Sequence, residues 1–230
     1  MKVIPSGIIL RHFFGLEGNL SLDVFLHLSS LLVILIFFRK DIACLARALF
    51  RKGLEKQSRE LVFSLGVASG VTAVVALVLR PHEELFSALP VVAAAYLVTG
   101  LLLFFTRREG REKIDWRRAL LIGLVQGLAV LPGLSRSGST IAVALATGVS
   151  REEAFRFSFL LAIPAISGAG LLEFRKIAGL QPWPLVVGMS VAFLLGLLSL
   201  SLLRRLLHWR GLAWFSLYCL ALSLLCWLLR

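Results

Sequence analysis

Charged residues are scarce in this sequence, and acidic residues are the scarcest of them. Charged residues make up 17% of the chain and hydrophobic residues 58%, whereas a typical soluble domain is about a quarter charged. The 13 Asp and Glu are outnumbered by 25 Lys and Arg, and long neutral stretches separate the charge clusters. Together with a mean hydropathy of +0.88, this composition excludes an ordinary soluble domain and indicates an integral membrane protein.

Cysteines and linkers are also few. The three cysteines, Cys44, Cys219 and Cys226, are odd in number and have no metal-ligand spacing, so we expect neither a disulfide framework nor a metal site built on them. No continuous apolar run precedes Arg11, which argues against a cleavable signal peptide. No low-complexity stretch interrupts the chain, and we therefore expect a single membrane domain over residues 1–230.

The net charge of +12 is carried by short basic loops between apolar segments. Residues 39–60, which we interpret as a loop, hold seven Lys or Arg against three acids, and residues 106–118 hold six against three. This bias places both loops in the cytoplasm and argues against nucleic acid as a partner. A helix needs about 20 apolar residues to cross a bilayer. Six segments qualify, at approximately 22–38, 61–79, 85–105, 154–174, 185–203 and 212–229.

Two further apolar segments are too short to cross a membrane. Residues 119–131 and about 139–149 are separated by Pro132 and Gly133, which interrupt a helix. Irregular backbone at membrane depth is tolerated only where protein or a wet cavity surrounds it. Two half-length helices with such a break between them therefore predict a re-entrant hairpin.

The two halves of the chain share a layout. The pairs Ser6-Gly7 and Ser137-Gly138 are each followed at a similar distance by an apolar span. These two spans run in opposite directions, and inverted halves with broken segments are typical of proteins with a site near the midplane. The predicted fold class is therefore an all-α polytopic membrane protein, an inverted-repeat bundle of about six transmembrane helices plus re-entrant half-helices. The first repeat covers about 1–105 and is incomplete at its start, and the second covers about 119–229.

The break between the short helices contains the polar motif PGLSRSGST, residues 132–140. An arginine at a helix centre costs about 2.5–3.5 kcal/mol on insertion scales, and no acid lies within ten residues upstream of Arg136. A guanidinium binds phosphate through two parallel hydrogen bonds, and a helix beginning near Ser139 would direct its positive end to the same place. The motif thus predicts a phosphate site, with close helix packing by its small residues as the alternative. The residues concerned are Gly133, Ser135, Arg136, Ser137, Gly138, Ser139 and Thr140.

Polar residues elsewhere are weaker candidates. Gln126 lies within the first short helix and would bind the phosphate group of the ligand or a cation. Arg156, near the start of a span, either reaches the membrane interface or contacts the phosphate group of the ligand. Asp23 and His27 lie four residues apart on one helix face. They form either a polar pair near the site or a helix-start acid and a buried histidine.

Residues 122–173, IGLVQGLAVLPGLSRSGSTIAVALATGVSREEAFRFSFLLAIPAISGAGLLE, resemble the undecaprenyl-diphosphatase family, the bacitracin-resistance phosphatases of bacterial envelopes. Weaker similarity covers residues 22–42 and the C-terminal spans. The resemblance implies a hydrolase that converts undecaprenyl diphosphate to undecaprenyl phosphate, recycling the lipid carrier for peptidoglycan and cell-wall synthesis and conferring bacitracin resistance. It also implies a multi-pass protein of the bacterial inner membrane, with its site facing the periplasm.

The same resemblance assigns site residues by position in the motif. It implies catalytic roles for Ser135, Arg136 and Thr140. We expect the substrate, a polyprenyl diphosphate lipid in the bilayer, to be bound by Gly133, Ser137, Gly138, Ser139, Gln126, Arg156, Ser6 and His27. The resemblance further implies a divalent cation, Mg²⁺ or Ca²⁺, although its ligands are unknown because the sequence shows no ligand set. A homodimer is a further expectation.

The start of the chain departs from the family's first motif. That motif carries two glutamates four apart, then Leu-Pro, a short serine run, Gly and His. Here Ser6-Gly7 matches the end of the serine run, with Pro5 and Ile8 where the family has a functional serine and the histidine. The glutamate pair would lie before Met1, so either the chain start is misassigned or this is a degenerate member. The alternative function is therefore a non-catalytic polyprenyl-phosphate transporter or flippase.

Overall fold

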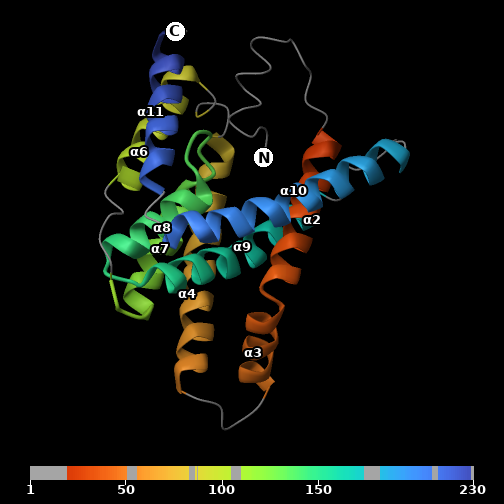
Figure 1. Cartoon of the computed structure of the whole chain (residues 1–230), viewed down its shortest axis with the longest axis vertical. Helices are drawn as coiled ribbons and strands as arrows, with labels where there is room; N and C mark the ends of the chain where they lie inside the picture. The colour runs from red at the N-terminus through yellow and green to blue at the C-terminus, as the bar shows by residue number, and fades with distance from the viewer. Residues whose placement is uncertain are drawn as a thin grey trace.

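A computed structural model describes residues 20–50, 56–82, 86, 88–104, 110–173, 182–208 and 212–228. Helices are the regular elements throughout this described part, which confirms the predicted all-α class (Figure 1). In chain order they are α2 (Leu20–Phe37), α3 (Arg39–Phe50), α4 (Lys56–Leu79), a 3₁₀ turn (Arg80–His82), α6 (Leu89–Phe104), α7 (Trp116–Leu128), α8 (Arg136–Ala146), α9 (Arg151–Glu173), α10 (Pro182–His208) and α11 (Leu212–Leu228).

Each of the six predicted spans coincides with one helix, namely α2, α4, α6, α9, α10 and α11. Among the described residues, three helical segments are long and apolar enough to cross a membrane: Ser58–His82, Arg151–Leu171 and Gly188–Leu207. Shorter apolar helices cover Leu28–Phe37, Leu89–Phe104 and Trp214–Leu228. Many large apolar side chains on these helices are exposed, as expected where a helix faces lipid. The protein is a helical membrane protein.

The prediction of a loop over residues 39–60 was wrong. Helix α3 begins at Arg39 directly after α2, and α4 already begins at Lys56. The segment is helical because it is rich in Ala and Leu, which favour helix, and its charges are spread between these apolar residues. Helix α3 packs against the start of α4 (Figure 1), where Cys44 Sγ lies 3.9 Å from Ser58 Oγ.

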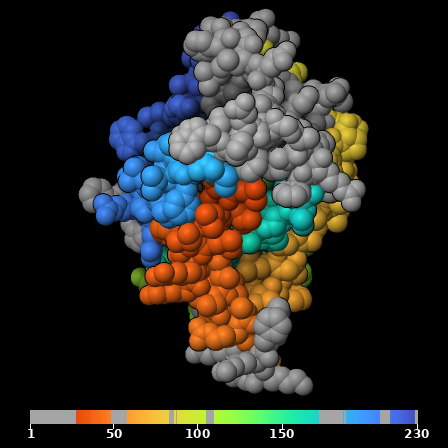
Figure 2. Space-filling model, turned by 90° about the vertical axis from the view of Figure 1, so that its right-hand side faces the viewer, coloured from red at the N-terminus to blue at the C-terminus, as the bar shows by residue number. Residues whose placement is uncertain are grey.

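Helices of the two predicted repeats are packed against one another, including two of the three corresponding pairs, α2 with α9 and α6 with α11. Helix α2 contacts both α9 and α10, α4 contacts α9, and α6 packs along α11. Figure 2 shows α2 on the surface between α10 and α9. The two contacts α2–α10 and α4–α9 would be equivalent under an axis that exchanges the halves. The division into two repeats stays a prediction.

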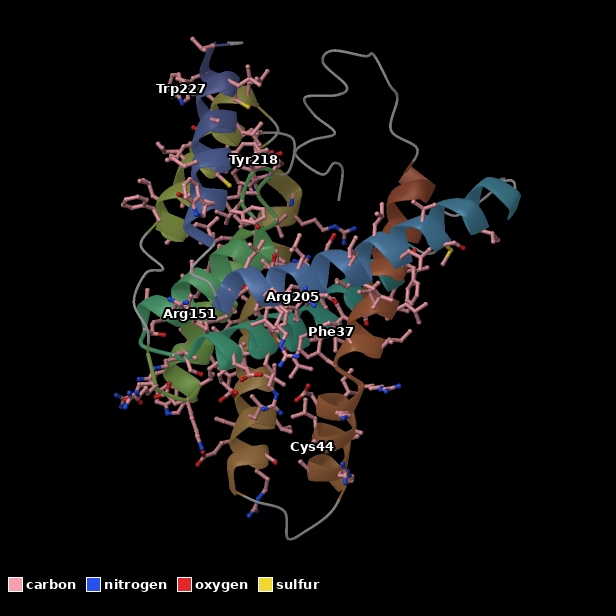
Figure 3. All side chains as sticks on the ribbon, viewed as in Figure 1. Phe37, Cys44, Arg151, Arg205, Tyr218 and Trp227 are labelled. Carbon is pink, nitrogen blue, oxygen red and sulfur yellow. The ribbon has the colours of Figure 1, made fainter. Side chains whose placement is uncertain are left out.

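Aromatic and ionic contacts fix the crossings around α9. Phe38, between α2 and α3, stacks on Phe159 of α9 with ring centroids 5.9 Å apart. Phe37, labelled in Figure 3 on α2, meets Phe155 edge to face. At the start of α9, the buried Arg151 donates from Nη1 to the Leu207 carbonyl oxygen at 3.0 Å. A cation at this point satisfies a carbonyl at the end of α10 and complements the helix dipole.

Small residues allow α7 to lie directly on α4. A Cβ atom added at Gly123 would lie 2.6 Å from the Ala68 carbonyl oxygen, and one at Gly127 would lie 2.5 Å from Val75 Cβ. Thr72 Oγ1 also donates to the Gly123 carbonyl oxygen at 3.0 Å. Glycines four apart on one helix face are the usual means of close helix contact in membranes. This seam fixes α7, and therefore the segment that follows it.

The three cysteines are free thiols in the structure.

Candidate functional site

The predicted re-entrant hairpin is formed by α7 and α8, and its two ends are joined. The Glu112 amide donates to the Gly148 carbonyl oxygen at 3.0 Å, and the Ser150 amide donates to the Glu112 carbonyl oxygen at 3.3 Å. Arg118 Nε also donates to the Thr147 carbonyl oxygen at 3.2 Å. The chain therefore enters and returns on the same side, with residues 129–135 at the far tip.

The tip turns sharply at Gly133. Its φ of +97° lies in a region that L side chains rarely adopt, and a Cβ atom there would lie 2.7 Å from the Val92 carbonyl oxygen of α6. Thr99, also on α6, bonds to the residues on either side of Leu134. The tip is thus held against α6 by backbone proximity and by one buried hydroxyl.

Helix α8 begins at Arg136 rather than near Ser139, because Ser135 serves as its N-cap. Ser135 Oγ accepts from the Gly138 amide at 3.2 Å, and the Ser135 carbonyl oxygen accepts from the Ser139 amide at 2.8 Å. Within the described part of the chain, the amides of Arg136 and Ser137 have no such partner. The first amides of a helix point out of its end and carry a partial positive charge. Such an end is suited to bind an anion.

The motif's hydroxyls divide into two groups. Ser135 is exposed and Ser137 is half-buried, whereas Ser139 and Thr140 are fully buried. The Ser139 hydroxyl donates to the Ser135 carbonyl oxygen at 2.6 Å. The Thr140 hydroxyl lies 2.8 Å from the Arg136 carbonyl oxygen and 2.5 Å from Ser158 Oγ on α9. Exposure thus favours Ser135 for contact with a ligand, while Thr140 connects the first turn of α8 to α9.

The Arg136 guanidinium is half-buried, and among the described residues it has neither an ion pair nor a hydrogen-bond acceptor. Carboxylates near the hairpin and along α9 pair with other arginines instead. Arg118 pairs with Glu112 and Asp115 at 3.5 Å each, Arg156 pairs with Asp41 at 2.7 Å and Glu153 at 3.7 Å, and Arg204 pairs with Glu152 at 2.7 Å. A cation at the positive end of α8, with no acidic partner among the described residues, is suited to bind an anion.

Two predicted site residues have internal partners. Arg156 joins α9 to α3 through an ion pair with Asp41, a partner that the sequence analysis did not anticipate. Gln126 is buried on α7, and its Nε2 donates to the Leu161 carbonyl oxygen of α9 at 3.2 Å. Its Oε1 is buried and has no hydrogen-bond partner among the described residues. Ser6 and the side chains of Asp23 and His27 lie outside the described residues.

Two residues that bear on the site were missed by the sequence analysis. Thr99 and Ser158 are hydroxyl residues inside apolar spans, far in sequence from the motif. Their polarity in a lipid-facing segment was a signal. The sequence could not say which carbonyl or hydroxyl each would meet, because that depends on how the spans cross.

The described residues hold no group of three or more His, Cys, Asp or Glu side chains that could bind a metal ion. The described carboxylates nearest the hairpin ends are engaged with arginine. Within the described part of the chain we therefore assign no side-chain ligands to a divalent cation, and we derive no step through one.

The comparisons with known proteins agree with this geometry. The family model described as "Bacitracin resistance protein BacA" matches residues 6–225. The undecaprenyl-diphosphatase of Desulfosudis oleivorans is 40% identical over 97% of this chain and 90% of its own length. The enzymes of the same name from Thermosipho africanus and Carboxydothermus hydrogenoformans are 37% and 35% identical, over 94% and 95% of this chain and 88% and 87% of their own lengths. These matches over nearly the whole chain show its family: the chain belongs to the BacA bacitracin-resistance family.

Proposed function

We propose that this protein is a membrane phosphatase that removes the terminal phosphate of undecaprenyl diphosphate at the tip of the α7–α8 hairpin. The carrying observation is Arg136, a cation at the positive end of α8 that has no acidic partner in the described part of the chain. A diphosphate head group supplies the missing negative charge, and membership of the BacA family supplies the reaction class.

Each group at the start of α8 has a role in this proposal. The Arg136 guanidinium binds two oxygens of the terminal phosphate and stabilises the charge that develops on them. The free amides of Arg136 and Ser137 bind the same group. Ser135 Oγ accepts one hydrogen bond from Gly138 and retains its own proton, so it can donate to the phosphate or attack it. Thr140 holds the turn behind Arg136 through the Arg136 carbonyl oxygen.

The chemistry has two forms that give the same products. In one, the Ser135 Oγ–P bond forms as the bond from the terminal phosphorus to the bridging oxygen breaks, and the hydroxyl proton passes to the departing phosphate. Undecaprenyl phosphate then leaves with that oxygen, and water hydrolyses the phosphoserine. In the other, Ser135 orients the phosphate and water attacks directly. Either form releases one inorganic phosphate and leaves the lipid carrier as a monophosphate.

We also propose that the site opens to the periplasm and that the protein forms a homodimer. The basic hairpin ends carry the cytoplasmic charge bias, and the tip is at the opposite end of the hairpin from them. Labelling of a Ser137→Cys variant by a membrane-impermeant thiol reagent in intact cells tests the orientation. Chemical crosslinking in native membranes tests the dimer.

The decisive test is phosphate release from undecaprenyl diphosphate by the purified full chain in detergent. The Arg136→Ala variant loses charge-assisted hydrogen bonds worth about 1.5–3 kcal/mol. We therefore expect its kcat/KM to fall roughly 10- to 150-fold. Arg136→Lys retains the charge but lacks the planar guanidinium, so its kcat/KM should lie between those of the unaltered chain and Arg136→Ala. Arg204→Ala is the matched control, because Arg204 is half exposed and pairs with Glu152 away from the motif.

The outcome also separates the enzyme from the alternative. Tight binding of the lipid with no turnover by the unaltered chain would favour the non-catalytic transporter. Equal activity of the Arg136→Ala and Arg204→Ala variants would refute the proposed role of the guanidinium.

A further inference from the structure

A single threonine on α6 is hydrogen-bonded to both sides of the hairpin tip. Thr99 is fully buried, and its Oγ1 lies 2.9 Å from the Ala95 carbonyl oxygen and 3.2 Å from the Gly133 carbonyl oxygen. The same oxygen accepts a hydrogen bond from the Ser135 amide at 3.3 Å. A hydroxyl has one proton to donate and lone pairs to accept with. One side chain therefore meets a carbonyl before Leu134 and an amide after it.

These bonds act at the point where the chain changes from turn to helix. Gly133 is at positive φ, and Ser135 must be extended, with φ −69° and ψ 114°, for its Oγ to cap Gly138. The Ser135 amide belongs to the same residue as the hydroxyl that we propose contacts the phosphate. Fixing that amide fixes the direction in which the Ser135 side chain and the first turn of α8 emerge.

From this geometry we infer that Thr99 is a positioning residue for Ser135 and Arg136. It lies on a helix of the first half of the chain, and through it that half sets the geometry of a motif carried by the second half. Because Thr99 is fully buried, it acts through the tip and does not touch the substrate. The inference rests on the proposed function for its catalytic consequence, and on the described contacts alone for its structural one.

Ordinary helix packing explains part of this arrangement. Threonines in membrane helices often donate to the carbonyl four residues earlier, as Thr99 does to Ala95. That bond alone would leave the hydroxyl with no part in the tip. The hydrogen bond from the Ser135 amide is the feature that a packing role does not require, so the test must separate the hydroxyl from the volume of the side chain.

The test uses Thr99→Val, which keeps the volume and removes the hydroxyl, and Thr99→Ser, which keeps the hydroxyl. Thr72→Val is the matched control, because Thr72 is also a buried threonine that donates to a hairpin carbonyl, that of Gly123 at 3.0 Å. Its contact is on the shaft of α7 instead of the tip. The readouts are kcat and KM for undecaprenyl diphosphate, and hydrogen–deuterium exchange of the peptide covering residues 129–139 in the full chain.

We expect Thr99→Val to lower kcat roughly 10- to 100-fold, because misplacement of reacting groups by about 1 Å costs up to that much. KM should change little, since the guanidinium is retained. Thr99→Ser should stay close to the unaltered chain, and Thr72→Val should lose thermal stability with kcat retained. Exchange over residues 129–139 should rise in Thr99→Val and stay unchanged in Thr72→Val.

Two results would overturn the inference. One is unchanged exchange at the tip in Thr99→Val, and the other is a Thr99→Ser variant as impaired as Thr99→Val. If the unaltered chain released no phosphate, the proposed function would fail. The exchange measurement would still decide whether Thr99 holds the tip.

Discussion

Gly133→Ala is the perturbation whose effect follows most directly from the structure. A side chain at φ +97° is strained and costs about 1–3 kcal/mol, partly offset by about 0.4–1 kcal/mol from the stiffer unfolded chain. The new Cβ would also lie 2.7 Å from the Val92 carbonyl oxygen, where an ordinary contact begins at 3.4 Å. The tip or α6 must therefore shift by about 0.7 Å, which is 3.4 minus 2.7 Å.

Gly148→Ala is the matched control for this change. Gly148 is also at positive φ, +85°, and belongs to the same hairpin. A Cβ atom there would meet only Glu112 Cγ, at an ordinary 3.6 Å. The two variants thus share the backbone strain and differ in the displacement. Both should lower the thermal unfolding temperature by several degrees, at roughly 2–4 °C per kcal/mol for a chain of this size.

Activity should separate the two variants. The shift at Gly133 moves the residues that precede Ser135, so we expect kcat for undecaprenyl diphosphate to fall roughly 10- to 100-fold. Gly148→Ala should retain kcat within a factor of about two to three, because strain alone lowers stability without moving the tip. The assay is phosphate release in detergent at a temperature well below both unfolding transitions. A Gly133→Ala protein with unaltered kcat, or a Gly148→Ala protein equally inactive, would contradict the reasoning.

Three further predictions concern the α4–α7 contact, the Thr140–Ser158 hydrogen bond and the cation. Gly127→Ala places a Cβ atom 2.5 Å from Val75 and should lower the unfolding temperature by more than Gly70→Ala, where no atom lies within 4 Å; equal shifts would argue against a close α4–α7 seam. A double-mutant cycle of Thr140→Val and Ser158→Ala should give a coupling free energy of about 0.5–1.5 kcal/mol for their hydrogen bond, and additive effects would mean that the contact contributes nothing. We also propose, from the family resemblance, that activity requires a divalent cation: a chelator should abolish phosphate release and excess Mg²⁺ or Ca²⁺ should restore it, while activity that survives exhaustive chelation would exclude that requirement.

The positions of individual contacts explain why Arg156 and Gln126 were hard to interpret from sequence. Both are polar residues within apolar helices, and that pattern alone fits a ligand site, an interface or an internal pair. Arg156 pairs with Asp41, which lies 115 residues earlier in the chain (156 minus 41). Gln126 meets a carbonyl of α9. Neither partner is close in sequence, so no local pattern could distinguish the possibilities.

The sequence by itself determined the membrane class, the six spans and the hairpin, because each depends on the length of apolar runs against bilayer thickness and on Pro and Gly in the backbone. It also located the motif, because an arginine in an apolar region is costly wherever it lies. The helical form of α3 was missed because its charges resemble those of a loop. Only the tertiary structure decided that Ser135 caps α8, that Thr99 holds the tip, and that nearby acids are paired with arginines other than Arg136. Those features depend on which helices cross and where, and a single sequence encodes such crossings through contacts between residues far apart in the chain.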